Sequence, residues 1–176
     1  NGISRFILLS SVKAGGEESV DRVPLKIGML PQPEDAYGRT KLAAEQILFK
    51  LCEETDMEVI ILRPPLIYGP GIKGNLLSLF QAVDKGLPLP LRGIDNRRDL
   101  LYVGNLVAAM IHAMSMPSHL CGTYYVSDGQ AVSVPELVRQ IANALDRPSR
   151  LLPVPPIFLR GLGAASGKSE LIKRLM

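Results

Sequence analysis

The sequence has 176 residues, 47% of them hydrophobic and 21% charged, which is an ordinary globular composition with room for a core. Its 20 basic and 17 acidic residues are spread along the chain and give a net charge of +3, so neither nucleic acid nor a membrane is indicated as a partner. The two cysteines, Cys52 and Cys121, lie far apart without a CxxC spacing, which favours neither zinc nor a disulfide framework and makes a reduced, cytoplasmic setting the default.

The N-terminal third has the pattern of a strand-helix-strand unit. The apolar run at 5–11 (RFILLSS) predicts a buried strand that ends in hydroxyl residues. Residues 12–35 are rich in Gly, Pro and charge and predict a loop, whereas apolar residues at helical spacing predict a helix over 36–55. A second buried strand is expected over 58–63 (EVIILR). This order of elements implies a parallel sheet.

Shorter elements follow. The Pro- and Gly-rich residues 64–74 are expected to end the second strand, because proline has no N–H for a ladder. Asn75 is a candidate helix cap, and Ser133 and Glu136 have the spacing of a capping box. The remaining elements expected, in chain order, are a helix over 75–85, extended pieces over 87–93 and 100–103, a helix to about residue 114, a strand over 123–126 and a helix over 133–145.

Tyr37 and Lys41 stand four residues apart near the start of the expected helix, which puts both side chains on one face. A nearby ammonium favours the phenolate form of a tyrosine, and Tyr37 would then be a usable acid/base near neutral pH. The spacing alone also fits a surface helix with a solvated lysine. However, the preceding strand ends in Ser10 and Ser11, at the sheet edge where ligands of open α/β sheets bind.

Five motifs in fixed order carry a family resemblance. A strand ending in Ser-Ser is followed by Tyr-Gly-Arg-Thr-Lys, LRPPLIYGPG, RRDLLYVGNLVAA and YYVSDGQAVSVPELV. In order and spacing the chain resembles the extended short-chain dehydrogenase/reductases, and more narrowly their NAD-dependent nucleotide-sugar epimerase/dehydratase group. The resemblance covers about residues 4–145 and is nearest to bacterial UDP-sugar 4-epimerases and 4-keto-sugar reductases of polysaccharide pathways.

The resemblance implies an α/β fold, namely the C-terminal part of a Rossmann-type parallel sheet plus a small α+β substrate-binding domain. Residues 1–68 would be the C-terminal half of the NAD-binding domain and 69–176 the substrate-binding domain, with 100–116 packing back on the Rossmann part. A homodimer through the helix at 37–55 is a further expectation. The sequence lacks the glycine-rich turn that cradles a dinucleotide pyrophosphate, so we expect an N-terminally truncated chain that is inactive alone.

The resemblance also implies roles for individual residues. The catalytic residues would be Ser11, which holds the reacting oxygen, Tyr37 as the acid/base, and Lys41, which binds the nicotinamide ribose and tunes Tyr37. The cofactor would be NAD, with NADP as the alternative, and no metal is expected. The implied cofactor contacts are Ser10, Tyr37, Lys41, Pro64 and Pro65.

A UDP-sugar or related nucleotide sugar is the implied substrate. Arg98 would clamp the pyrophosphate with its planar fork, although outside the family context an ion pair with Asp95 or Asp99 is the alternative. The backbone at Leu91 and Arg92 would contact the base. The full set of implied substrate contacts is Asn75, Leu76, Leu91, Arg92 and Arg98.

Departures from the family pattern reduce the number of reactions that the resemblance allows. Val12 and Lys13 stand where the sugar 4,6-dehydratases carry an Asp-Glu pair for water elimination, so dehydration is disfavoured. Gly15 and Leu66 replace a tyrosine and an asparagine that many members have. Residues 163–169 resemble a phosphate-binding P-loop but have three residues between the glycines instead of four, which predicts a plain loop before a terminal helix.

The expected function is therefore NAD-dependent 4-epimerisation of a UDP-hexose through a transient 4-keto sugar. One alternative is an NAD(P)H-dependent reductase of a 4-keto-6-deoxy nucleotide sugar, which would use the same three catalytic residues. The other alternative is a catalytically silent fragment or binding domain.

Overall fold

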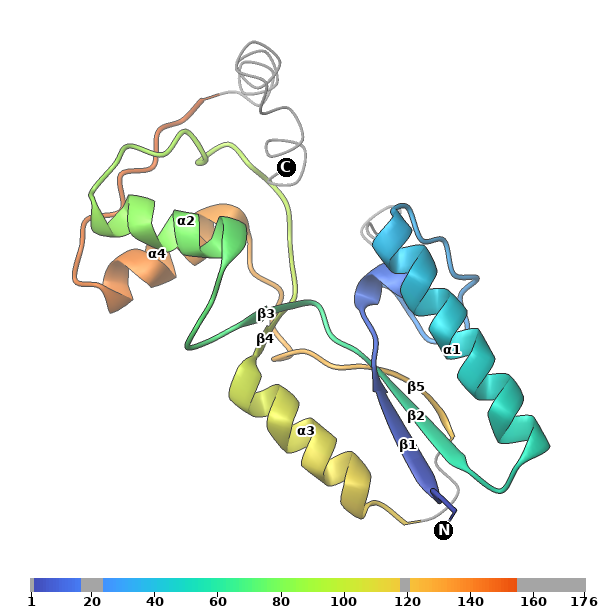
Figure 1. The fold of residues 1–176 in the computed structure, drawn as a ribbon. Coiled ribbons are helices and arrows are strands. Elements are labelled where there is room, and N and C mark those ends of the chain that lie inside the picture. The colour runs from blue at the N-terminus through green and yellow to red at the C-terminus, as the bar shows by residue number, and fades with distance from the viewer. Residues whose placement is uncertain (1, 17–23, 118–120, 155–176) are drawn as a thin grey trace. The chain divides into compact units, whose positions relative to one another are not determined.

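The chain forms two compact units, each built from two stretches of sequence. The computed structural model describes residues 2–16, 24–117 and 121–154. The first unit combines residues 1–69 with 100–128, and the second combines 70–99 with 129–176 (Figure 1). Within the described residues, no helix is long and apolar enough to cross a membrane.

A parallel sheet is the centre of the first unit. Strands β1 (Arg5–Leu9), β2 (Glu58–Arg63) and β5 (Gly122–Tyr125) lie in the order β1-β2-β5, and both pairs are parallel. Helix α1 (Ala36–Glu54) connects β1 to β2, as predicted. The fold is therefore mixed α/β with a parallel sheet. The loop expected after β1 begins with a short 3-10 helix, η1 (Val12–Ala14).

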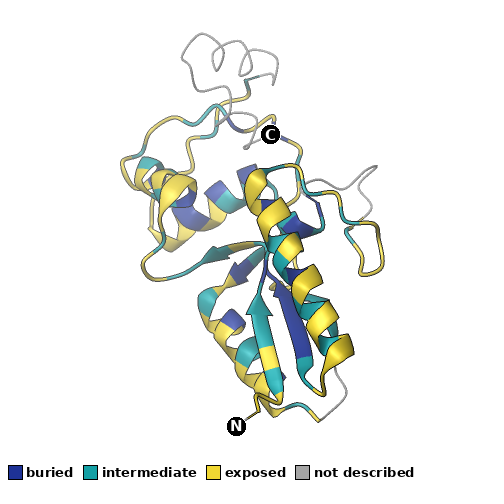
Figure 2. Ribbon diagram, turned by 45° about the vertical axis from the view of Figure 1, so that its right-hand side comes forward, coloured by how far each residue is buried: buried dark blue, intermediate teal, exposed yellow. Residues whose placement is uncertain are grey.

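Strand β2 is buried on both faces, and Figure 2 shows it in the colour of buried residues. Ile60 and Leu62 pack with Ala113 of helix α3 (Val103–Ser115). Arg63 is directed to the other face, where it bonds to α1. Because successive side chains of a strand alternate, one strand supplies core residues to helices on both sides of the sheet.

Arg5 joins the start of the sheet to the end of α3. Its guanidinium donates to the carbonyl oxygens of Ala113 and Met114 at 3.0 Å and of Met116 at 2.8 Å. It also pairs with Glu58 at 2.6 Å. The last carbonyls of a helix lack partners within the helix and carry partial negative charge, so a cation at this place stabilises the end of α3.

A second, two-stranded parallel sheet was not predicted. Strand β3 (Leu66–Tyr68) pairs with β4 (Leu100–Tyr102). Residues 64–74 were expected only to end the preceding strand. Pro64 and Pro65 do separate β3 from β2, but they do not prevent the chain from pairing with a different strand directly after them.

Asp128 links this small sheet to the segment that follows β5. Its carboxylate accepts hydrogen bonds from the backbone N–H of Tyr102 at 3.1 Å and from Asn105 Nδ2 at 2.8 Å. Tyr68 of β3 also donates to it. One side chain thus holds β3, the end of β4 and the start of α3.

Helices α2 (Gly74–Asp84) and α4 (Val134–Ala144) pack on each other in the second unit. The capping box of α4 is confirmed, because Ser133 Oγ accepts from Glu136 N at 3.3 Å and the Glu136 carboxylate accepts from Ser133 N at 2.8 Å. The core of the unit consists of Val83, Leu91, Ile94, Val134, Val138, Ile141 and Ala142.

Two local predictions for the second unit were wrong. Lys73 holds the cap position of α2, and Asn75 lies inside the helix instead of capping it. The extended piece expected over 87–93 is a single parallel bridge, Leu89 to Leu151, followed by a turn. The described part of this unit therefore consists of helices joined by turns and isolated bridges. The P-loop-like residues 163–169 and the terminal helix expected after them lie outside the described residues.

Replacing Asp128 with Asn is expected to lower the Tm by about 2–4 °C at pH 7, because an amide oxygen is a weaker acceptor than a carboxylate. Burial raises the pKa of Asp128, but the hydrogen bonds from Asn105, Tyr102 and Tyr68 outweigh burial and leave that pKa below its ordinary value. The stabilisation is therefore full above the unfolded-state pKa of about 4 and is lost as the pH falls through the lower folded-state pKa.

Thermal unfolding of the wild type and Asp128→Asn between pH 7 and pH 3 tests this. The Tm difference should stay constant down to about pH 5 and shrink below about pH 4. Asp56→Asn, at an exposed turn, is the matched control and should change little. A Tm difference that is the same at pH 7 and pH 3 would contradict the role given to the Asp128 carboxylate.

Candidate active site

The carboxyl ends of β1 and β2 stay paired beyond the strands themselves. Ser10 N donates to Leu62 O at 2.8 Å, and Val12 N donates to Pro64 O at 3.0 Å. These bonds enclose Ser11, which is half-buried and caps η1 by accepting from Lys13 N at 3.3 Å. The backbone thus fixes Ser11 at the sheet edge where parallel α/β folds bind ligands.

The start of α1 is held against η1 at two points. The Asp35 carboxylate accepts from Gly38 N at 2.7 Å, which caps the helix, and its other oxygen pairs with Lys13 Nζ at 2.7 Å. Gly38 permits the close approach, because a Cβ at this position would collide with the carbonyl oxygen of Lys13. The glycine of Tyr-Gly-Arg-Thr-Lys therefore sets how near α1 lies to the strand end.

Lys41 lies between Tyr37 and the end of β1. Its Nζ is 5.7 Å from the centroid of the Tyr37 ring and donates to Leu9 O at 2.9 Å. Tyr37 itself is 53% exposed, so its hydroxyl is accessible to a bound molecule. The lysine side chain thus fixes the tyrosine side of α1 relative to the strand that carries Ser10 and Ser11.

A buried polar network lies one helical turn further along α1. Arg63 binds the Glu45 carboxylate through both oxygens, with Nε at 3.0 Å and Nη2 at 2.5 Å. Ser10 Oγ donates to the same carboxylate, and Arg63 Nη1 donates to Tyr125 Oη at 3.0 Å. Glu45 and Arg63 are 2% and 7% exposed. The network therefore joins α1 to all three strands of the sheet.

The Glu45 carboxylate stabilises the buried positive charge of Arg63. Burial lowers the pKa of Arg63, but the hydrogen bonds and the charge of Glu45, with a further contribution from Tyr125, outweigh burial and raise that pKa above its ordinary value. Gly15 makes room for the arrangement, because a Cβ there would collide with the Tyr125 hydroxyl and the Arg63 guanidinium. This is a physical reason for glycine at position 15.

Sequence analysis missed this network. Glu45 continues the four-residue spacing of Tyr37 and Lys41, so a third polar residue on the same helix face was visible as a signal. Its partner Arg63 ends a strand that otherwise consists of apolar residues after Glu58. A charged residue at the buried end of such a strand requires a partner of opposite charge.

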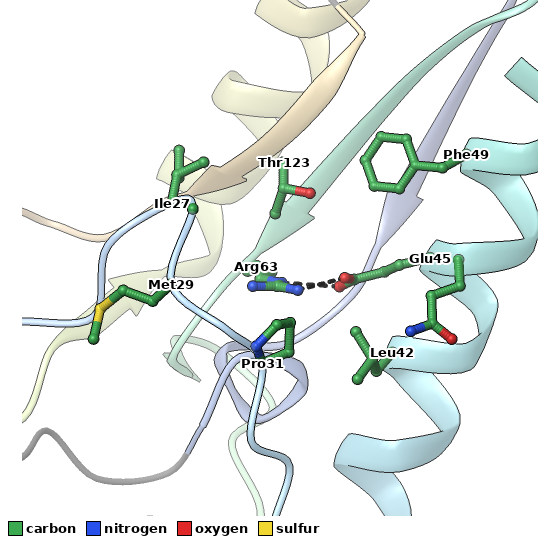
Figure 3. Close-up of a pocket in the computed structure, with 10 residues that line it drawn as sticks. Ile27, Met29, Pro31, Leu42, Glu45, Phe49, Arg63 and Thr123 are labelled. Atoms are coloured by element: carbon green, nitrogen blue, oxygen red, sulfur yellow. Dashed lines mark hydrogen bonds and ion pairs between the residues drawn. The ribbon is translucent and has the colours of Figure 1, made fainter. Parts of the chain in front are cut away.

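A cavity of about 250 Å³ opens beside the ion pair (Figure 3). Leu42, Glu45 and Phe49 of α1 form one wall, and the segment at 27–31 forms another. Arg63 and Thr123 come from the sheet. None of the residues predicted for catalysis or cofactor binding lines this cavity, so it is separate from the edge that carries Ser11, Tyr37 and Lys41.

The five residues predicted for substrate binding all lie in the second unit. Asn75 and Leu76 are in the first turn of α2, where Asn75 is exposed and Leu76 is buried. Leu91 is buried in the core, and exposed Arg92 donates its backbone N–H to Leu152 O at 3.3 Å. The exposed Arg98 pairs with Val132 in an antiparallel bridge. Buried Leu76 and Leu91 leave only their backbone for contact with a ligand.

Comparison with known proteins finds relatives along nearly the whole chain. The model of the NAD dependent epimerase/dehydratase family matches residues 1–126. The UDP-glucose 4-epimerase of Vibrio cholerae is 42% identical over 176 residues, which are 99% of this chain and 54% of that protein. The GDP-6-deoxy-D-mannose reductase of Pseudomonas aeruginosa is 27% identical over 146 residues, which are 78% of this chain and 48% of that protein.

A solved structure agrees with the fold. The crystal structure of the Thermus thermophilus UDP-glucose 4-epimerase in complex with NAD superposes with a TM-score of 0.69 and 24% identity. The match covers 86% of this chain and 51% of that chain. The present chain thus spans about half the length of the relatives it matches.

Replacing Glu45 with Gln is expected to destabilise the chain by roughly 3–5 kcal/mol, because it leaves the Arg63 guanidinium buried without a compensating charge. Urea unfolding measures the loss. Glu53→Gln, an exposed residue of the same helix, is the matched control and should change the free energy of unfolding by less than about 0.5 kcal/mol. Equal stabilities of the two variants would show that the buried pair contributes nothing to folding.

Proposed function

Since the chain belongs to the NAD dependent epimerase/dehydratase family, we propose that the whole protein is an NAD-dependent nucleotide-sugar epimerase that inverts C4 of a UDP-hexose. The supporting observation is the connected group formed by Tyr37, Lys41 and the Ser10–Ser11 strand end at the carboxyl edge of a parallel sheet. The 42% identity to the Vibrio cholerae UDP-glucose 4-epimerase favours the same activity.

The residues at this edge fit the nicotinamide end of NAD. An ammonium has three N–H donors, so the bond from Lys41 to Leu9 O leaves two for the hydroxyls of a ribose. We assign the contact with the carboxamide to the backbone at Pro64 and Pro65, and place Ser10 beside the ring. NAD held by these residues would supply hydride chemistry, namely acceptance of a hydride from C4 of the sugar and its later return.

Proton transfer belongs to Tyr37. As a phenolate, favoured by the Lys41 ammonium, it takes the proton from the sugar 4-hydroxyl while C4 loses its hydride. The Ser11 hydroxyl holds the same oxygen through the 4-keto stage. After the keto sugar has presented its other face, Tyr37 returns the proton. Lys13 takes no part, because it pairs with Asp35 at the start of α1.

The second unit binds the nucleotide part of the substrate. We assign the pyrophosphate to Arg98, whose planar guanidinium can bond two oxygens at once. The backbone at Leu91 and Arg92 contacts the base, and Asn75 and Leu76 contact the diphosphate. This division makes the first unit the remaining half of a NAD-binding domain and the second unit the substrate-binding domain.

A homodimer through α1 completes the proposal, with the reaction placed in the cytoplasm. Ile47 and Leu51 lie four residues apart on α1 and are 61% and 39% exposed. Two exposed large apolar side chains on one helix face favour burial against a second copy of the helix.

A second candidate function is the NAD(P)H-dependent reduction of a 4-keto-6-deoxy nucleotide sugar. The 27% identity to the GDP-6-deoxy-D-mannose reductase of Pseudomonas aeruginosa favours it. Reduction uses Ser11, Tyr37 and Lys41 in the same roles but ends after one hydride and one proton have reached the sugar.

Incubation of the whole protein with UDP-glucose or UDP-N-acetylglucosamine distinguishes the epimerase from the reductase. The epimerase proposal expects net isomerisation at C4, followed by NMR, without net loss or gain of reduced cofactor. No isomerisation, together with consumption of one NADPH per 4-keto sugar supplied, would replace it by the reductase.

Replacing Tyr37 with Phe in the whole protein is expected to lower kcat about 10²–10⁴-fold, because the acid/base is lost while the ring is kept. Tyr102→Phe is the matched control, because that ring packs on Tyr68 and its hydroxyl has no role in the proposal. Steady-state kinetics on both variants provide the comparison. Equal loss in both variants would remove Tyr37 from the mechanism.

The 176-residue chain alone is expected to show no measurable turnover and little affinity for NAD, because it carries no glycine-rich turn for the pyrophosphate. Titration with NADH, followed by the increase in nicotinamide fluorescence, measures this. Saturable enhancement at micromolar concentrations would contradict the expectation.

A further inference from the structure

The two cysteines meet at the end of the sheet opposite to the candidate active site. Cys52 lies in the last turn of α1, and Cys121 lies directly before β5. Although 69 positions separate them in the sequence, their sulfur atoms are 2.9 Å apart. Neither spacing nor motif predicted this contact, which arises only when α1 and β5 both pack against β2.

The pair is held in place and accessible. The backbone N–H of Val59, at the start of β2, donates to Cys121 Sγ at 3.3 Å. Cys121 is exposed and Cys52 is half-buried, so a small reagent in solution can reach the pair. A disulfide bond is about 2.05 Å long, so the sulfur atoms need to approach each other by less than about 1 Å.

The surroundings favour thiol chemistry over metal binding. Within the described ranges, no group of three or more His, Cys, Asp or Glu side chains is arranged to hold a metal ion. The hydrogen bond to Cys121, followed by burial and the charge of Cys121, raises the pKa of Cys52 above its ordinary value. The more exposed Cys121 therefore meets a reagent first.

We propose that Cys52 and Cys121 are a redox site that closes to a reversible disulfide by exchange with a low-molecular-weight disulfide such as oxidised glutathione. This site is independent of the proposed sugar chemistry. It lies at the amino ends of the strands, whereas Ser11 and Lys41 lie at the carboxyl ends.

The exchange takes place in two balanced steps. The Cys121 thiolate attacks one sulfur of the small disulfide, which forms a mixed disulfide and releases the first small thiolate. The Cys52 thiolate then attacks the Cys121 sulfur, which forms the Cys52–Cys121 bond and releases the second. The two protons lost by the protein thiols are taken up by the two small thiolates. Two protein thiols are oxidised and one small disulfide is reduced to two thiols.

The disulfide would tie the last turn of α1 to the entrance of β5. It would enclose about 70 residues, and cross-links across long loops constrain the unfolded chain most strongly. The Tm should therefore rise on oxidation, by about 5–10 °C. In a reducing compartment, a disulfide of this kind forms only transiently and serves as a redox sensor instead of a permanent cross-link.

The experiment uses the full chain, reduced, freed of reductant and incubated with oxidised glutathione at increasing ratios. Intact mass, free-thiol counting and the Tm are then measured. We expect both thiols to disappear together, a mass loss of two hydrogen atoms without retained glutathione, a higher Tm, and reversal of all three by dithiothreitol.

Single variants identify the partners. Cys52→Ser and Cys121→Ser each remove the second step, so the remaining cysteine should keep one glutathione and the Tm should not rise. Retained glutathione on both cysteines of the wild type, disulfide-linked dimers or unreacted thiols would each overturn the proposal. If the disulfide forms without a change in Tm, the proposal that it ties α1 to β5 and stabilises the fold is wrong.

Discussion

Glu45 and Arg63 form a buried ion pair that links helix α1 to the sheet, and the candidate site depends on it. Through Ser10 and Tyr125 the same pair also contacts β1 and β5. Removing two charges from water is costly, and only the multiple hydrogen bonds of this network offset that cost. An apolar contact would tolerate a shift of α1 along the strands, whereas two directed bonds from one guanidinium to one carboxylate do not.

The position of Tyr37 follows from this constraint. Tyr37, Lys41 and Glu45 lie at successive four-residue steps on one face of α1, and their burial increases from the exposed tyrosine to the enclosed glutamate. Glu45 fixes the rotation of the helix, and Gly38 fixes its distance from η1. The end of α1 that carries Tyr37 is therefore placed by contacts within the protein and is positioned before any ligand binds.

Local patterns predicted the fold well where they were strong. The helix over 36–55, the strand over 58–63 and the capping box at Ser133 were visible because their periodicity and caps are encoded in neighbouring residues. The prediction over 87–93 failed, because Leu89 and Leu91 pack with the core of the second unit and the chain turns over residues 90–93. The roles of Ser11, Tyr37 and Lys41 came from the family resemblance, and they stay predictions. The Glu45–Arg63 and Cys52–Cys121 contacts join residues from different elements, which no window of sequence contains.

The two units alternate along the sequence, and this limits how segments can be exchanged between this chain and a related protein. Residues 70–99 supply α2 but not α4, which comes from 129–154 and completes the same core. Exchanging only the first of these segments with a relative would leave half of a foreign core against half of the native one. Residues 100–128 must also stay with the first unit, because they carry α3 and β5. A chimera that replaces the second unit therefore requires two simultaneous transplants, with junctions near residues 70, 99 and 129.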